Sequence, residues 1–244
     1  MIVKIQNKND FVTKFLAPIS KINENAVIKV HNDKITSLIT TNDETLILYV
    51  IYNEENNFSE AHNLNIPDVN RLIKVLNCIE SDNLDIDLDS NKLKYSSDTI
   101  NFKYHLLEDG IITTPSISFD KIKKLNFTTS FSISSNDIIN VIKGSTFTTD
   151  TDKIYLYTKD SKVYCELTDK QKHNIDSFTR VLSDAYKGDP LDEPIPLNFE
   201  IMRLISGLRF ENCEVNLDPE KRVLLFTISS DKYTLNFVTV GLVG

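Results

Sequence analysis

The 244-residue sequence predicts an α+β protein of two similar domains, each with a pair of helices laid across one face of a sheet. Three observations lead to this prediction. Many segments alternate in the manner of strands, whereas four segments have helical periodicity. The order of elements in residues 9–33 recurs in residues 136–160. The length is also sufficient for two domains of ordinary size.

The repeat is the most informative of these observations. Residues 9–33 and 136–160 both open with Asn-Asp ahead of a short apolar stretch, and both end in a hairpin turn. The helical segments Val69–Ile73 and Ile201–Ile205 form a second matching pair, and a similar strand follows each of them. A duplicated unit of this length is typical of two similar domains joined into a pseudo-symmetric body.

Helical periodicity predicts helices over about 9–17, 67–79, 136–145 and 197–208. Pro67 with Asp68 behind it is a good start signal for the second helix. Pro18 is expected to end the first helix near Ala17, because proline lacks the N–H that continues a helix.

β-Branched and aromatic alternation predicts the strands. Those of the first half are Val27–Val30, Ile35–Ile39, Leu46–Tyr52, Leu84–Leu88 and Ile100–Leu106. Those of the second half are Phe127–Ile133, Ile154–Tyr157, Val163–Leu167, Phe178–Leu182, Cys213–Leu217, Val223–Ser229 and Tyr233–Val240. The stretch between the halves has no period and reads as a surface connector. We therefore predict domains at 1–109 and 126–244, with an interdomain connector at 110–125.

Composition describes a globular protein, with 41% hydrophobic and 25% charged residues. No apolar run approaches the roughly 20 residues that span a bilayer, and residues 1–6 do not lead into a signal peptide. The three cysteines are far apart, and the apolar neighbours of Cys78 and Cys213 predict buried, reduced thiols. A cytoplasmic protein without a membrane partner is expected.

Signatures of catalysis are missing from the sequence. It contains no G-x-x-x-x-G-K phosphate loop, no G-x-G-x-x-G and no G-x-S-x-G elbow. The acidic run 85–90 resembles the start of a calcium loop, but its sixth position is Ser90 and its twelfth is Ser96. The four histidines have no ligand spacing. We therefore expect no enzyme activity, no cofactor and no metal site.

The net charge of −8, taken over the whole chain, argues against binding to nucleic acid. The cations are not evenly spread, however, because each predicted helix places at least one on its solvent side. The helix cations are Lys14, Arg71, Lys74, Lys143 and Arg203, with Lys21 and Arg209 near helix ends. A solvated helix face that complements the helix dipole explains this bias as well as a phosphate-contacting surface does.

The order of these elements resembles that of the DNA sliding clamps. The most similar branch is the trimeric processivity factors of tailed bacteriophages, which are related in architecture to the eukaryotic and archaeal clamps. The resemblance extends over nearly the whole chain and rests on pattern more than on any sharp motif. The segments that carry it are 9–16, 64–69, 178–181, 195–199 and 233–240.

The resemblance implies a homotrimeric ring around double-stranded DNA, with two clamp-type domains per subunit and antiparallel sheets outside the helices. It implies a polymerase processivity factor that a clamp loader places on DNA without reading its sequence. The residues that would face DNA are Lys14, Lys21, Arg71, Lys74, Lys143, Arg203 and Arg209.

The resemblance also implies where other proteins bind. An edge strand at 99–107 would pair with one at 175–186 of the next subunit, with Phe102, Tyr104, Phe178 and Val181 near the seam. The family's partner peptides dock in an apolar pocket beside the connector and the C-terminal strand. The residues in those positions are Ile111, Ile112, Pro115, Val240, Leu242 and Val243, and an ordinary connector and tail explain them equally well.

Two other functions are compatible with the sequence. A structural virion protein could build a ring or tube from duplicated domains, and its assembly would not depend on the helix charges. A hydrolase with dispersed carboxylates would need acids facing one cleft, and no motif supports it.

Overall fold

A computed structural model describes residues 1–56, 58–148, 151–172 and 174–242. The chain forms two compact units. The first contains Met1–Phe119 together with Ser229–Leu235, and the second contains Asp120–Ile228 and the residues from Asn236 onward. Each unit has the order strand, helix, four strands, helix, three strands, with a two-residue strand added in the second. The α+β class and the helix pair in each half are confirmed.

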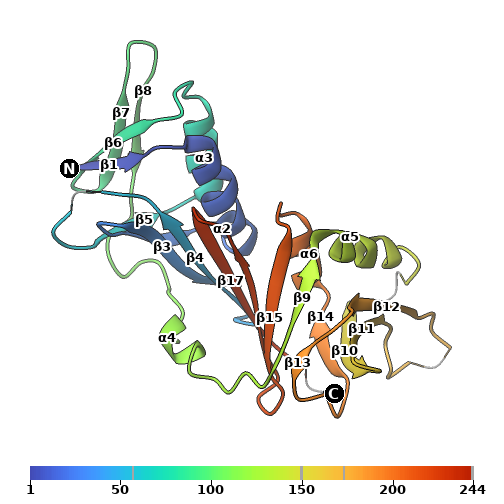
Figure 1. Ribbon diagram of the computed structural model, residues 1–244. Helices are drawn as coiled ribbons and strands as arrows, with labels where there is room; N and C mark the ends of the chain where they lie inside the picture. The colour runs from blue at the N-terminus through green and yellow to red at the C-terminus, as the bar shows by residue number, and fades with distance from the viewer. Residues whose placement is uncertain (57, 149–150, 173, 243–244) are drawn as a thin grey trace. The chain divides into compact units, whose positions relative to one another are not determined.

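The first unit holds two antiparallel sheets, with strand orders β1-β6-β7-β8 and β4-β3-β2-β5 (Figure 1). Tight turns such as 31–33 and 89–91 join neighbouring strands, as their Asn, Asp and Ser content predicts. The strands are β1 (Ile2–Ile5), β2 (Ala26–Val30), β3 (Lys34–Thr40), β4 (Leu46–Asn53), β5 (His62–Ile66), β6 (Leu84–Asp89), β7 (Lys92–Ser96) and β8 (Asn101–His105).

The second unit repeats this arrangement, with strand orders β12-β11-β10-β14 and β13-β9-β15-β16-β17, and the pairs are again antiparallel. The strands are β9 (Thr129–Ser134), β10 (Lys153–Lys159), β11 (Lys162–Leu167), β12 (Phe178–Ser183), β13 (Lys187–Gly188), β14 (Ile195–Asn198), β15 (Asn212–Asp218), β16 (Val223–Ser229) and β17 (Tyr233–Val240). By element order β8 corresponds to β17, and β4 to β12.

The first helix of the first unit is longer than predicted. Three consecutive segments, α1 (Lys8–Asp10), a π-helical stretch (Phe11–Leu16) and α2 (Ala17–Ile22), extend it to Ile22. The prediction that Pro18 ends the helix was wrong. Ala17 N–H bonds to the carbonyl of Val12 in the wide π pattern, so Pro18 falls in the first turn of α2, where a missing N–H is tolerated.

The second helix, α3 (Val69–Asn77), begins at an N-cap in which the Asp68 carboxylate accepts the Arg71 N–H at 2.8 Å. Its apolar stripe of Val69, Leu72 and Leu76 is buried, as the periodicity predicts. Helices α2 and α3 pack against each other, and α2 also packs against β3 and β4 (Figure 1). Their opposite faces are therefore turned to solvent.

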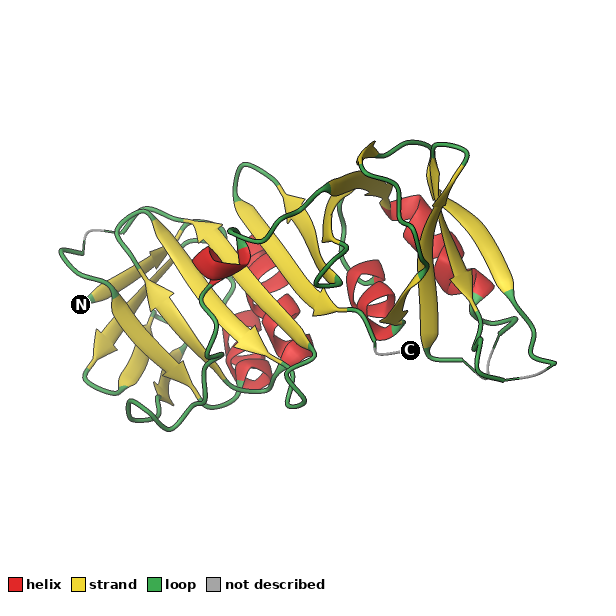
Figure 2. Cartoon of the chain, turned by 90° about the horizontal axis from the view of Figure 1, so that it is seen from below, coloured by secondary structure: helices red, strands yellow, loops and turns green. Residues whose placement is uncertain are grey.

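The helices of the second unit are α5 (Ser135–Gly144) and α6 (Glu200–Ser206), which also pack together (Figure 2). Ser134 caps α5 by accepting the Asp137 N–H at 3.2 Å. Helical periodicity predicts Ile138, Ile139 and Ile142 on the inner side of this helix, but Ile139 is exposed and Val141 is buried in its place. The buried stripe of α5 is Ile138, Val141 and Gly144, so it is rotated about the helix axis from the predicted one.

The predicted burial of Cys78 was also wrong. Leu76 and Ile79 face the core at the end of α3, so the intervening Cys78 is left exposed. Cys165 and Cys213 are buried, and burial raises the pKa of each thiol to about 12. Neither of these two thiols is a nucleophile at neutral pH.

The connector contains one helical turn that its sequence did not predict, α4 (Phe119–Ile122). Phe119 stacks on Tyr49 with ring centroids 4.5 Å apart, and both Phe119 and Ile122 are buried. Two apolar anchors thus fix a segment without hydrophobic periodicity. Separately, no helix in the described part of the chain is long and apolar enough to cross a membrane.

Gly144, the last residue of α5, leaves no room for a side chain. A Cβ there would overlap Cε1 of Phe178 on β12, so the ring would have to move. Helix propensity alone favours Gly144→Ala by about 1 kcal/mol. We expect the clash to reverse this sign and to destabilise the protein by about 1–3 kcal/mol in urea denaturation. Asn140→Ala on the same helix is the matched control, and an equal gain in both variants would contradict the close approach.

Candidate nucleic-acid interface

The helix pair of the first unit carries four of the seven predicted DNA-facing cations. Lys14 lies in the π-helical stretch, and Lys21 lies in the last turn of α2. Lys21 is exposed, and the Lys14 ammonium lies 5.4 Å from the centre of the Tyr233 ring. Ring contact of this kind holds a cation over the face of the ring.

Arg71 and Lys74 are three positions apart on the exposed side of α3, opposite its buried stripe. The Arg71 guanidinium carbon lies 5.9 Å from the centre of the Tyr104 ring. The Tyr104 hydroxyl donates to the carbonyl of Asp68 at 2.6 Å, so the start of α3, its cap and this ring form one fixed group. The N-terminal half of α3 therefore presents Arg71 from a rigid base.

The corresponding helices of the second unit carry two of the predicted DNA-facing cations, Lys143 and Arg203. Lys143 is exposed in the last turn of α5, and Arg203 is exposed on α6. The Arg203 guanidinium is paired with Glu200 at 3.3 Å and lies 5.0 Å from the centre of the Phe199 ring. Arg209 is exposed just beyond the end of α6.

Each unit has one four-stranded sheet with a closed edge. In the first unit, side chains close β1, because Asn56 Oδ1 accepts the Lys4 N–H at 2.8 Å and Glu54 Oε2 accepts the Gln6 N–H at 3.1 Å. In the second unit, the tail closes β14, because Leu242 N–H donates to the Pro196 carbonyl at 2.7 Å. A covered edge of this kind does not recruit another strand.

The opposite edge of each of these sheets is open. β8 in the first unit and β12 in the second have a strand neighbour on one side only, within the part of the chain that the structure describes. An unpaired strand edge is a template for another chain. The two predicted seam segments, 99–107 and 175–186, contain these two strands.

The four predicted seam residues differ in accessibility. Phe102, Phe178 and Val181 are half-buried on the open edges, whereas Tyr104 is 3% exposed and packs inside its own unit. Tyr104 therefore supports β8 and offers little surface of its own. Sequence reasoning missed Phe147, whose side chain is 62% exposed. The Phe147 N–H donates to the Gly144 carbonyl, so Phe147 lies within one turn of Gly144, against which the Phe178 ring packs. A lone aromatic residue in the polar stretch after helix 136–145 was the available signal.

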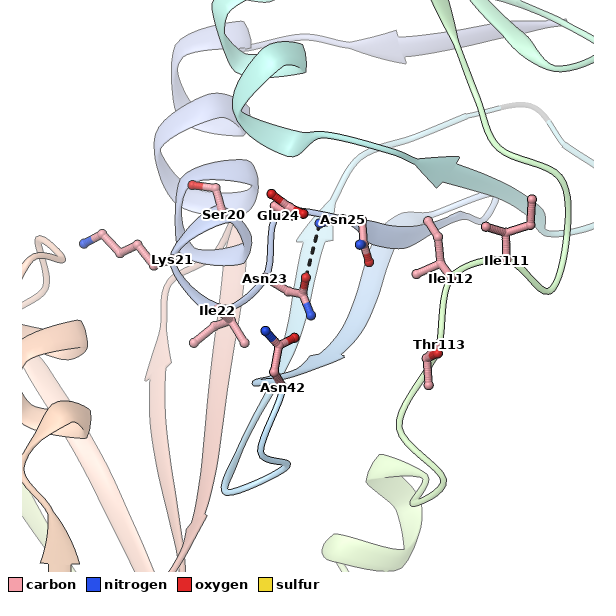
Figure 3. Close-up of a pocket in the computed structure, with 10 residues that line it drawn as sticks. All are labelled: Ser20, Lys21, Ile22, Asn23, Glu24, Asn25, Asn42, Ile111, Ile112 and Thr113. Carbon is pink, nitrogen blue, oxygen red and sulfur yellow. Dashed lines mark hydrogen bonds between the residues drawn. The ribbon is translucent and has the colours of Figure 1, made fainter.

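Two of the predicted partner-pocket residues line a pocket of about 530 Å³ in the first unit (Figure 3). Ile111 and Ile112 line one side, and the last residues of α2 with the three that follow them line another. Asn25 N–H donates to Asn23 Oδ1 at 3.4 Å, while the Lys21 side chain points away from the pocket in this view. The lining is polar apart from its isoleucines. The residues are Ser20, Lys21, Ile22, Asn23, Glu24, Asn25, Asn42, Ile111, Ile112 and Thr113.

The other predicted partner-pocket residues do not line this pocket. Pro115 is half-buried in the connector, and Val240 and Leu242 belong to the second unit. The tail there is tightly held, since a Cβ on Gly241 would approach Ile195 Cγ2 to 3.1 Å. It borders a second pocket of about 690 Å³. Val243 lies outside the described residues.

Among the described residues, no group of three or more His, Cys, Asp or Glu side chains is arranged to hold a metal ion. His31 contacts Thr36 Oγ1 at 3.2 Å. The carboxylates of β6 at positions 85, 87 and 89 are exposed, as strand alternation predicts.

Solved structures share this architecture over the full length of the chain. PCNA from A. fulgidus, solved with the C-terminal region of FEN-1, has a TM-score of 0.79 at 11% identity and covers 100% of this chain and 99% of its own. PCNA from Thermococcus kodakaraensis has a TM-score of 0.78 at 15% identity, with 99% of each chain covered. PCNA from Entamoeba histolytica has a TM-score of 0.76 at 14% identity, covering 99% and 98%. The chain has a PCNA-like clamp fold.

No protein-family model matches the sequence, and no curated protein matches it either. At identities of 11–15%, these structures share the fold of the chain with few identical residues. The predicted resemblance to the sliding clamps is therefore confirmed at the level of a PCNA-type fold. These structures do not distinguish the tailed-bacteriophage branch from the others.

Proposed function

We propose that this protein is a DNA sliding clamp, a non-catalytic ring that encircles duplex DNA and tethers a replicative polymerase. The observation that carries the proposal is the clamp fold over the whole chain combined with exposed cations on its helices. An acidic protein of net charge −8 places Lys21, Arg71 and Lys74 on one helix pair. Sequence-independent phosphate contact requires such point charges. Tethering raises the effective concentration of polymerase at the primer end without tight DNA binding.

We propose a homotrimer as the working form. Its support is the open edge in each unit, because β8 of one copy and β12 of the next can pair head to tail. A heterologous contact of this kind builds a closed ring when the rotation between copies closes. The tailed-bacteriophage type, a clamp loader and a site of action in the host cytoplasm follow from the sequence resemblance, and we include them in the proposal.

We further propose that partner proteins bind by short peptides at the connector. The pocket beside Ile111 and Ile112 supports this, because Ile111 is exposed beside a cavity large enough for side chains. The A. fulgidus protein is solved with a region of FEN-1, which shows that one protein of this fold binds a partner segment.

The proposal predicts that reversing Arg71 and Lys74 to glutamate weakens retention on DNA and leaves the trimer intact. Two like charges facing phosphate would repel it, whereas neither residue lies on β8 or β12. Mass in solution and stimulation of a polymerase on primed circular DNA measure the two effects.

Normal stimulation by this variant at physiological salt would exclude the helix face as the DNA surface. A wild-type monomer that stimulates no polymerase would exclude the clamp, and a ring that ignores DNA would favour the virion alternative.

A further inference from the structure

The two helix pairs of this chain differ in how far their cations are already neutralised. In the first unit, α3 has Arg71 and Lys74 against the capping carboxylate of Asp68, and the adjoining first helix has three lysines against one aspartate, Asp10. In the second unit, α5 has one acid and one base, and so has α6. The charge that the sequence distributes over four helices is thus concentrated on two.

The two helix pairs also differ in the ion pairs that their side chains make. Among the described residues, Lys21, Arg71 and Lys74 make no ion pair with a carboxylate, and the neighbour of Arg71 is the ring of Tyr104. On α6, the Arg203 guanidinium is 3.3 Å from the Glu200 carboxylate. On α5, Asp137 is 3.4 Å from Arg180 of the open edge strand β12. Each helix pair has two carboxylates in a first turn or cap, Asp10 and Asp68 in the first pair and Asp137 and Glu200 in the second. The first pair has five cations beside them, whereas the second has two.

We infer that the helix pair of the first unit is the principal phosphate-contacting surface of this protein, and that the pair of the second unit contributes little; this inference rests on the proposed function. A phosphate that approaches Arg203 also approaches Glu200, so attraction and repulsion largely cancel. The Asp68 carboxylate near Arg71 is engaged as the cap of α3, and among the described residues no carboxylate pairs with the Arg71 guanidinium or the Lys74 ammonium. A phosphate can therefore contact both cations and release counterions from DNA. In a ring of three copies the strong contacts then repeat threefold, although the fold itself repeats sixfold.

The test compares matched neutralisations on the two helix pairs. Arg71→Gln with Lys74→Gln, and Lys143→Gln with Arg203→Gln, each remove two positive charges. Equilibrium binding of each full-length variant to a short, fluorescently labelled duplex is measured over a salt series. Mass in solution and thermal unfolding verify that both variants fold and assemble as the wild type does.

The first-unit variant is expected to bind about tenfold more weakly, with a salt slope reduced by roughly 1 for each lost phosphate contact. The second-unit variant is expected to lose less than about twofold. Glu200→Gln is expected to tighten binding, because it frees Arg203. Equal losses in the two double variants, or a larger loss in the second, would overturn the inference while leaving the clamp in place. A wild type that does not bind the duplex at any salt concentration would overturn the proposed function itself.

Discussion

Phe147→Asp is expected to convert the assembled protein into a folded monomer. Phe147 is 62% exposed and lies within a turn of Gly144, against which the Phe178 ring of the open edge strand β12 packs. A large aromatic residue beside an unpaired strand is typical of an interface hot spot, where truncation costs about 2–4 kcal/mol of binding. A buried carboxylate without a partner would cost more. The fold of each copy is expected to survive, because Phe147 contributes little to its own core.

Sedimentation equilibrium over a range of concentrations measures this effect, and far-ultraviolet circular dichroism reports on the fold. Ile2→Asp is the matched control. Ile2 is 51% exposed, but it lies on β1, whose edge is closed by Asn56 and Glu54. If Phe147→Asp associates as the wild type does, or if Ile2→Asp dissociates the assembly equally, β12 is not the seam.

Lys232→Met is expected to destabilise the protein by about 2–3 kcal/mol. The Glu54 side chain is fully buried, and its Oε2 accepts the Gln6 N–H at 3.1 Å and lies 3.3 Å from the Lys232 ammonium. Its Oε1 has no hydrogen-bond partner among the described residues. Removing the lysine therefore leaves a buried carboxylate held by one N–H. Loss of a partner from a fully buried pair costs roughly 3–5 kcal/mol, and we expect less because the Lys232 side chain is 34% exposed.

A double-mutant cycle with Glu54→Gln identifies the cause. Glutamine keeps an oxygen for the Gln6 N–H but carries no charge, so Lys232→Met should cost much less in that background. Urea denaturation gives the four free energies of unfolding. Equal costs of Lys232→Met in both backgrounds would mean that the lysine acts through its contact with the Tyr52 ring, whose centre lies 5.2 Å from the ammonium, and not through the Glu54 carboxylate.

Much of the fold could be predicted from local patterns. The stripe Val69, Leu72 and Leu76 marked the inner face of α3, and the alternation at 84–88 marked a strand with its carboxylates outside. These features arise within single elements, so neighbouring residues suffice to reveal them. The predictions for Pro18 and Ile139 were wrong because the π-helical turn and the position of the buried stripe depend on what each helix packs against.

The sites were less accessible to sequence reasoning than the elements. The exposed positions of Arg71, Lys74 and Lys143 followed from helical periodicity. The i, i+3 spacing of Glu200 and Arg203 is typical of an ion pair on a helix. Such a pair weakens the attraction of Arg203 for phosphate. The exposure of Phe147 and the burial of Tyr104 could not be predicted, since both depend on residues distant in sequence.

Periodicity and spacing along the chain were sufficient to predict the α+β class, the duplication, the helix pair of each half and the cations on the helix faces. Which strand edges are open became clear from the folded chain alone. β1 is closed by side chains from Glu54 and Asn56, about fifty positions along the chain, and β14 is closed by the tail at Leu242. Hydrogen bonds between segments so far apart leave no periodic trace in the sequence, and they exist only once the backbone has brought donor and acceptor together.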